Sequence, residues 1–229
     1  MIDIGCGDGL YAKILFAEKL DTGIDPDPHE RARARALGAY HELIQCHGAS
    51  VPKPDGTYRA IFSNSVLEHI PDLAPVRKEA HRLLAPGGRF FFTVPSPNFE
   101  RFTAINLMLE ALGLMALSRR FRAFFNRFWM HYHTYPLEAW VALAKEAGFE
   151  VIEACTYDPK RICLFNAALT PFALPSKVVK AMTNRWFLLP GLRRMMAGPI
   201  SVLAATPPAR RRARRGWRSR FLGAAEALT

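Results

Sequence analysis

The sequence predicts an α/β domain built on a mainly parallel β-sheet with helices on both faces. Short apolar runs alternate with stretches of helical periodicity up to about residue 170, which is typical of parallel sheets. A glycine-rich segment, residues 5–9, directly follows the first apolar run, as in folds that bind a ligand at a strand end. Half of the residues are hydrophobic, which suffices for a packed core.

The expected strands are short apolar runs bounded by turn residues. Seven runs fit this description, so a seven-stranded sheet is expected. They are Met1–Ile4, Thr22–Asp25, Ala39–Leu43, Arg59–Ser63, Arg89–Val94, Phe149–Thr156 and Ile162–Leu169.

Three helices are expected between these strands, at 28–38, 73–85 and 136–147. Asp27 precedes a proline and then a glutamate at capping-box spacing, which indicates a helix start. Asp72 is placed to cap the second helix in the same way. Glycines follow all three helices, where they commonly end a helix.

Two regions depart from this alternation. Residues 96–133 form an insertion, with a long apolar part followed by a basic and aromatic part. Residues 171–229 hold 12 Lys and Arg but one acid, so they carry the whole net charge of +11 while residues 1–170 are neutral. We therefore expect a core at 1–170 that includes the insertion at 96–133, and a basic, partly apolar extension at 171–229 whose end is disordered.

The composition also limits the chemistry. The four cysteines are scattered and form no C-x-x-C pair, so neither a zinc site nor a disulfide framework is indicated. Reduced thiols favour a cytoplasmic location. No stretch reaches 18 uninterrupted apolar residues, so no spanning helix is expected.

The glycine-rich segment predicts a nucleoside-type ligand. Gly5, Gly7 and Gly9 differ from the dinucleotide pattern G-x-G-x-x-G, because Leu10 stands where the third glycine belongs. The tight turn still leaves backbone open to a ligand. Asp25 lies 20 residues beyond Gly5 at a strand end, where a carboxylate can accept hydrogen bonds from ribose hydroxyls.

Three segments resemble the motifs of class I S-adenosylmethionine-dependent methyltransferases, and their order and spacing fit the type 11 (UbiE/UbiG-like) subgroup. These segments are Asp3–Gly9, Asn64–Asp72 and Leu84–Arg89. The resemblance covers residues 1–95 well and 134–157 more loosely. It implies a Rossmann-like methyltransferase fold with S-adenosylmethionine as cofactor. Family members usually have a helix before the first strand, so we expect the sequence to begin inside the domain.

The resemblance also implies a set of cofactor contacts. Asn64 would lie near the methionyl group and the transferred methyl, and Asp25 would hold the ribose. Family members often carry an acid beside the adenine, but the stretch Cys46–Ala49 has none, which leaves His47 or backbone groups for that role. The remaining contacts, around the methionine and ribose, would come from Asp3, Gly5, Cys6, Gly7 and Gly9.

A sulfonium methyl is already activated, so the protein mainly has to orient the acceptor for in-line displacement. A general base helps if the acceptor is a hydroxyl, and the candidates are His69, His131 and His133. His131 and His133 are expected on one side of an extended segment, with a surface or core role as the alternative. Some quinone O-methyltransferases bind a metal through Glu-x-x-Glu-His, but Ser65 replaces the first glutamate here, so no metal is expected.

The insertion and the extension bear on the acceptor. An apolar lid at 96–133 suggests a small-molecule or lipid acceptor or a bilayer surface; the alternative is packing on the domain or on a second subunit. The mixed Arg and aromatic extension fits an anionic membrane surface, or weak nucleic-acid binding. We expect a cytoplasmic enzyme, peripheral on the inner face of the membrane. The alternatives are a nucleic-acid or protein methyltransferase, disfavoured because residues 63–66 lack the Asn/Asp-Pro-Pro-aromatic loop, and a catalytically weak adaptor.

Overall fold

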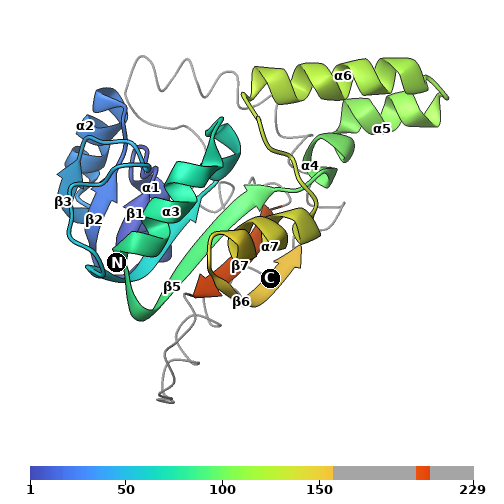
Figure 1. Cartoon of the computed structure of the whole chain (residues 1–229). Helices are drawn as coiled ribbons and strands as arrows, with labels where there is room; N and C mark the ends of the chain where they lie inside the picture. The colour runs from blue at the N-terminus through green and yellow to red at the C-terminus, as the bar shows by residue number, and fades with distance from the viewer. Residues whose placement is uncertain (157–199, 207–229) are drawn as a thin grey trace.

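The computed structural model describes residues 1–156 and 200–206, and its centre is a seven-stranded sheet in the order β3-β2-β1-β4-β5-β7-β6 (Figure 1). Neighbouring strands from β3 to β5 pair in parallel, while β7 runs antiparallel to both of its neighbours. The expected α/β class and the mainly parallel sheet are confirmed. The strands are β1 (Ile2–Ile4), β2 (Leu20–Ile24), β3 (Tyr40–Ile44), β4 (Tyr58–Asn64), β5 (Leu84–Pro95), β6 (Glu150–Thr156) and β7 (Ile200–Thr206).

The strand β7 corrects the expected domain boundary. It comes from the segment that the sequence analysis assigned to an extension beyond residue 170, yet it lies between β5 and β6. The run Ile-Ser-Val-Leu-Ala-Ala-Thr has the apolar character of a strand. Its surroundings of proline and arginine hid this signal. The strand expected at 162–169 and the tail after 206 lie outside the described residues.

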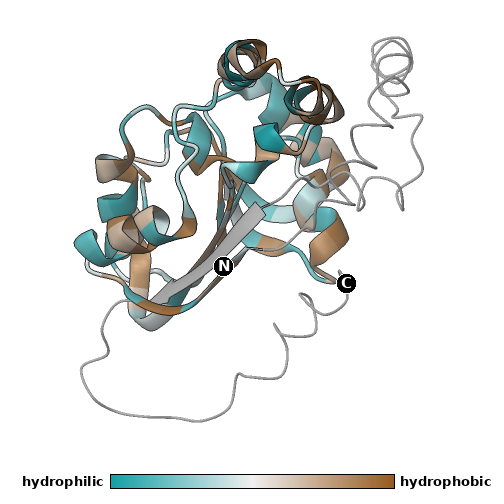
Figure 2. Cartoon of the chain, turned by 90° about the vertical axis from the view of Figure 1, so that its right-hand side faces the viewer, coloured by the Kyte–Doolittle hydropathy of each residue, from teal (hydrophilic) through white to brown (hydrophobic). Residues whose placement is uncertain are grey.

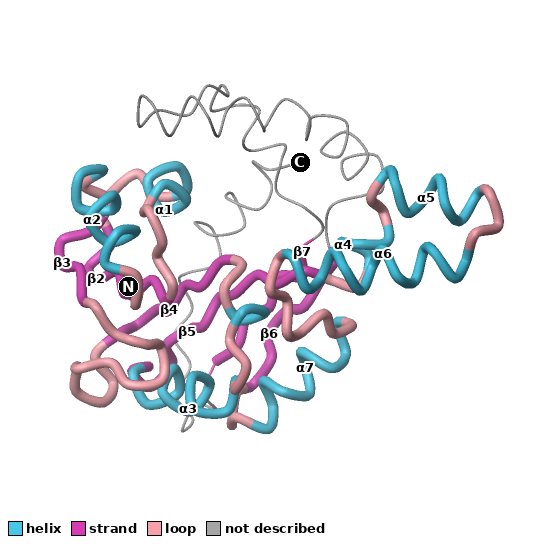
Figure 3. The backbone as a smooth tube through the Cα atoms, turned by 90° about the horizontal axis from the view of Figure 1, so that it is seen from above, coloured by secondary structure: helices cyan, strands magenta, loops and turns pink. Residues whose placement is uncertain are grey.

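Helices cover both faces of the sheet, as expected (Figure 3). On one side lie α1 (Leu10–Leu15) and α2 (Pro28–Leu37), and on the other α3 (Leu73–Leu83) and α7 (Leu137–Glu146). The carboxylates of Asp27 and Asp72 accept the backbone N–H groups of His29 and Ala74, which confirms both predicted N-caps.

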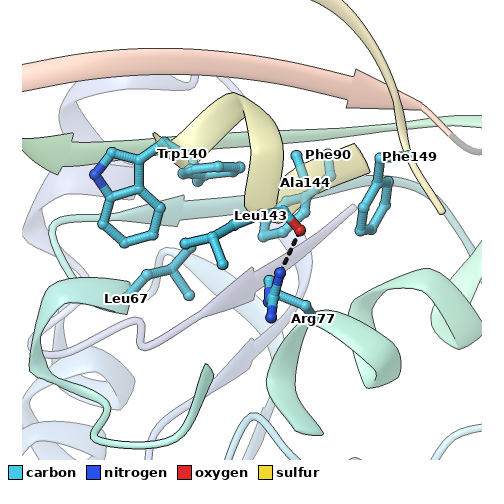
Figure 4. A pocket seen from close by; sticks show the side chains of 8 residues that line it. Leu67, Arg77, Phe90, Trp140, Leu143, Ala144 and Phe149 are labelled. Atoms are coloured by element: carbon cyan, nitrogen blue, oxygen red, sulfur yellow. Dashed lines mark hydrogen bonds between the residues drawn. The ribbon is translucent and has the colours of Figure 1, made fainter. Parts of the chain in front are cut away.

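The larger core cluster lies between the sheet and the helices α3 and α7. Trp140 and Phe90 are almost fully buried in it. Arg77 is among the residues that line a small apolar cavity beside them, and its guanidinium donates to the carbonyl of Leu143 (Figure 4). Since aromatic side chains fill this face, the cavity belongs to core packing.

The insertion forms three helices: α4 (Asn98–Arg101), α5 (Ala104–Ala111) and α6 (Met115–Phe128). The helices α5 and α6 pack on each other and project from the body of the domain (Figures 1 and 3). In the described part of the chain, no helix has both the length and the apolar character needed to cross a membrane.

Candidate cofactor site and histidine cluster

Three segments that are expected to bind the cofactor meet at one edge of the sheet. The glycine loop (residues 5–9) follows β1, Asp25 follows β2, and Asn64 is the last residue of β4. The strands β2, β1 and β4 are neighbours in the sheet. The chain runs outward from β1 to β3 on one side and from β4 onward on the other, so the order of strands reverses between β1 and β4. Ligands of open α/β sheets bind in the crevice at such a switch point.

The three glycines of the loop have different roles. All have a positive φ: 75° at Gly5, 50° at Gly7 and 73° at Gly9. A Cβ on Gly5 would lie 2.5 Å from the side chain of Val66, and one on Gly9 would lie 3.0 Å from Tyr40. Nothing lies within 4 Å of the Cβ position at Gly7. Gly5 and Gly9 therefore allow close packing, and Gly7 presents backbone to open space.

Asp25 is held facing this loop. One oxygen of its carboxylate accepts the backbone N–H of Gly7 at 2.9 Å, and the other accepts that of Asp27 at 2.9 Å. The side chain is half-buried. Each carboxylate oxygen has a further lone pair, so the group can still accept hydrogen bonds from a ligand.

Asp3 and Cys6 lie behind the loop. Asp3 is buried, and the Tyr40 hydroxyl donates to its carboxylate at 2.6 Å. Burial raises the pKa of Asp3 to about 7, with a smaller contribution from the charge of Asp25, while the Tyr40 hydrogen bond opposes the shift. Burial also raises the pKa of the Cys6 thiol, which packs in the smaller core cluster. Their direct cofactor contacts stay predictions, and the structure gives both side chains packing roles.

The amide of Asn64 is oriented by the neighbouring strand. The hydroxyl of Thr93 on β5 donates to the Asn64 side-chain oxygen at 2.6 Å. This bond fixes the orientation of the amide, whose nitrogen can donate to a ligand.

Two of the three candidate histidines come together. His69 lies on the 3₁₀ helix η1 (Leu67–His69), and His131 lies just after α6; their ring centroids are 5.2 Å apart. Burial, with a contribution from His69, lowers the pKa of His131 to about 4. The side chain is therefore neutral at neutral pH.

His133 is not part of this pair. Its Nε2 faces the carbonyl oxygens of Ile70 and Pro71 at 2.9 and 3.2 Å, so this nitrogen carries the proton. Its Nδ1 then accepts the Tyr135 hydroxyl at 2.9 Å. With both nitrogens engaged, His133 ties the end of the insertion to the segment after β4, and we do not retain it as a base.

Comparison with known proteins identifies the family of the chain. A family model described as a methyltransferase domain matches residues 1–154. The chain belongs to this methyltransferase family. The resemblance to class I S-adenosylmethionine-dependent methyltransferases is thereby confirmed.

Relatives of this methyltransferase chain include two curated enzymes. The ubiquinone biosynthesis O-methyltransferase of Sodalis glossinidius is 33% identical over 107 residues, covering 43% of this chain and 42% of that protein. The protein of the same name from Pectobacterium carotovorum is 32% identical over 107 residues, covering 43% and 44%. The chain thus spans less than half the length of the curated relatives it matches.

Solved structures share the methyltransferase fold. The cyclase SpnF has a TM-score of 0.58 at 16% identity, covering 91% of this chain and 75% of that one. Geranyl diphosphate methyltransferase in complex with S-adenosylmethionine has a TM-score of 0.57 at 16% identity, covering 90% and 77%. At such identities the likeness shows the fold alone, and it confirms the Rossmann-like methyltransferase architecture.

The methyltransferase core also uses residues that the sequence analysis did not single out. Tyr40 contacts Asp3, and Thr93 contacts Asn64, in each case from a different strand. No local sequence pattern predicts such contacts. Glu68 is fully buried, and one of its oxygens accepts the Ser65 hydroxyl at 2.5 Å.

Proposed function

We propose that this chain transfers the methyl group of S-adenosylmethionine to a small apolar acceptor. The observation that carries the proposal is the Gly7 backbone, which faces open space beside the Asp25 carboxylate at the switch point. In this arrangement Asp25 accepts the ribose hydroxyls and the Asn64 amide donates to the methionyl end.

The chemical step needs little beyond placement. The sulfonium is a good leaving group, so the acceptor has to be held in line with the methyl while water is kept out. A hydroxyl acceptor also loses its proton. His69, on the 3₁₀ helix directly after β4, is the candidate to receive it, and the ring of His131 lies beside it with a centroid distance of 5.2 Å.

The lid supports the proposal of an apolar acceptor, because it buries polar groups and exposes large apolar side chains, the reverse of the usual arrangement in a water-soluble domain. Its interior holds polar groups: the Ser118 hydroxyl donates to buried Asn106 at 2.7 Å, and Arg122 pairs with buried Glu100 at 2.9 Å. Its outer surface exposes many large apolar side chains. Figure 2 shows hydrophobic and hydrophilic residues alternating along the helices of the lid. The large exposed side chains of α5, α6 and their flanks are Ile105, Met108, Leu112, Leu114, Met115, Leu117, Phe124, Phe128, Trp129 and Met130.

Exposed apolar surface of this kind normally contacts a partner or a membrane. Arg119, Arg120 and Arg127 are exposed on α6 among these side chains. Apolar groups with interspersed arginines suit the surface of an anionic bilayer. We therefore propose that the enzyme lies peripherally on a membrane. Since curated relatives are named ubiquinone biosynthesis O-methyltransferases, we propose an aromatic hydroxyl on an apolar tail as the acceptor.

The test measures labelled methyl transfer from S-adenosylmethionine to hydroquinones or catechols with and without an isoprenoid tail, presented in vesicles. We expect transfer to the tailed acceptor, and its loss in Asp25→Ala. Absence of transfer to every hydroxylated acceptor would contradict the proposed acceptor class.

The lid is tested by co-sedimentation with anionic and neutral vesicles. We expect Leu112→Asp with Phe128→Asp to reduce sedimentation with anionic vesicles. The control is Ile152→Asp, since Ile152 is also an exposed apolar residue but lies on β6. Equal loss in the control would rule out a specific role of the lid.

A further inference from the structure

A buried carboxylate lies directly behind the glycine loop. Asp3 is the middle residue of β1, two positions before Gly5, and it is almost fully buried. Its strand pairs with β2 on one side and with β4 on the other, and these strands lead to Asp25 and Asn64. A cofactor bound at the ends of these strands therefore lies near the carboxylate of Asp3.

Tyr40 reaches this carboxylate from β3, across the intervening strand β2. Its hydroxyl donates to Oδ2 of Asp3 at 2.6 Å. The ring passes over Gly23, which is paired with Asp3, and a Cβ at Gly23 would lie 2.9 Å from the ring. A Cβ at Gly9 would lie 3.0 Å from the other side of the ring. Glycine at these two positions makes room for the ring, and the close packing holds the hydroxyl on Asp3.

The charge of Asp3 is set by the groups around it. Burial and, to a lesser degree, the charge of Asp25 raise its pKa, the Tyr40 hydrogen bond lowers it, and the result is a pKa of about 7. Burial raises the pKa values of Tyr40 and of the neighbouring Cys6 thiol, to which the charges of Asp3 and Asp8 add, so both keep their protons. The helices α1 and α2 contribute buried alanines to this cluster. Removal of the Tyr40 hydroxyl therefore favours the neutral form of Asp3.

The cofactor and its product differ in charge at the sulfur atom. S-adenosylmethionine carries a sulfonium cation, whereas S-adenosylhomocysteine, which is left after methyl transfer, has a neutral thioether. An ionised carboxylate inside a protein attracts a nearby cation more strongly than in water, because the local dielectric constant is lower. It exerts no such attraction on the thioether.

We propose that Asp3 and Tyr40 together make the site prefer the sulfonium cofactor over the neutral product. Tyr40 is a positioning residue in this account, because it acts through Asp3. Once the methyl group has been transferred, the sulfur is neutral and the attraction is lost, which favours release of the product. The inference rests on the proposed placement of the cofactor against Gly7 and Asp25.

The test measures the affinities of the full chain for S-adenosylmethionine and S-adenosylhomocysteine by calorimetric titration between pH 6 and pH 8.5. In the parent chain, we expect the ratio of the two affinities to shift toward S-adenosylmethionine by roughly fivefold as Asp3 ionises. Tyr40→Phe keeps the ring and removes the hydroxyl, so this shift should move to higher pH. At pH 7.5 the ratio should then fall by about two- to threefold relative to the parent chain. Both ligands carry the same amino acid group, so its own titration largely cancels in the ratio.

The matched control is Tyr58→Phe. Tyr58 is also a buried tyrosine, but its hydroxyl donates to the uncharged side chain of Thr22 at 2.8 Å. This variant should keep the pH profile of the parent chain, whereas Asp3→Asn should remove the shift with pH altogether. Thermal melts of all variants verify folding.

Two results would overturn the inference while leaving the cofactor site in place. One is an affinity ratio that does not change with pH in the parent chain, and the other is the same profile for Tyr40→Phe as for Tyr58→Phe. Failure of the parent chain to bind either ligand would contradict the proposed cofactor placement itself, and this inference with it.

Discussion

At the residue scale, the site rests on buried polar groups that are paired at long range. Asp3 and Tyr40 come from different strands, and so do Asn64 and Thr93. The glycine loop and Asp25 were predictable from sequence because their spacing is local to one β-α-β unit. The partners Tyr40 and Thr93 were not, because only the pairing of strands decides which side chains face each other.

Asp3 makes stability depend on pH. Burial raises its pKa from 3.8 to about 7, so between about pH 4 and pH 7 the folded chain holds a proton that the unfolded chain has lost. The free energy of unfolding from this group therefore falls as the pH rises through that window. We expect Asp3→Asn to remove this part of the pH dependence, measured by urea unfolding at pH 5 and pH 7.5.

Asp72→Asn is the control for this measurement. Asparagine is also a good N-cap, and Asp72 is exposed, so this variant should keep the part of the pH dependence that Asp3 contributes. An Asp3→Asn variant with the slope of the parent chain would contradict the buried-carboxylate account.

At the scale of elements, most boundaries were predictable and β7 was not. The helices at 28–37 and 73–83 follow from their caps and apolar spacing, which act locally. A strand can be recognised from its own residues, but its place in the sheet depends on distant partners. For β7 those partners, Phe92 and Cys155 among them, lie 111 and 47 residues before the paired Leu203 and Val202.

The position of β7 is tested by Val202→Pro. Val202 pairs with Thr93 on one side and Cys155 on the other, so proline disrupts a strand in the interior of the sheet. We expect a loss of at least about 1–3 kcal/mol in the free energy of unfolding, the cost of an unpaired backbone group. Val202→Ala, which keeps the N–H, should cost less. Equal effects of the two substitutions would mean that residues 200–206 do not lie in the sheet.

At the scale of the whole molecule, the sheet, the lid and the site form one arrangement. The parallel strands bring the glycine loop, Asp25 and Asn64 to one edge, and the insertion after β5 returns through His131 to the 3₁₀ helix after β4. The lid's inverted polarity was partly predictable, since its apolar run was visible in the sequence. The buried Asn106 and Glu100 beneath it needed the fold.

The central claim is that the cofactor lies against Gly7 and Asp25. Calorimetric titration of the full chain with S-adenosylhomocysteine tests it most directly, with Asp25→Ala and, as matched control, Asp27→Ala, which removes only the cap of α2. The account predicts saturable binding that Asp25→Ala weakens by roughly tenfold to a hundredfold, as expected for lost hydrogen bonds to a charged group, while Asp27→Ala retains it. No saturable binding by the parent chain, or equal affinity after Asp25→Ala, would contradict it.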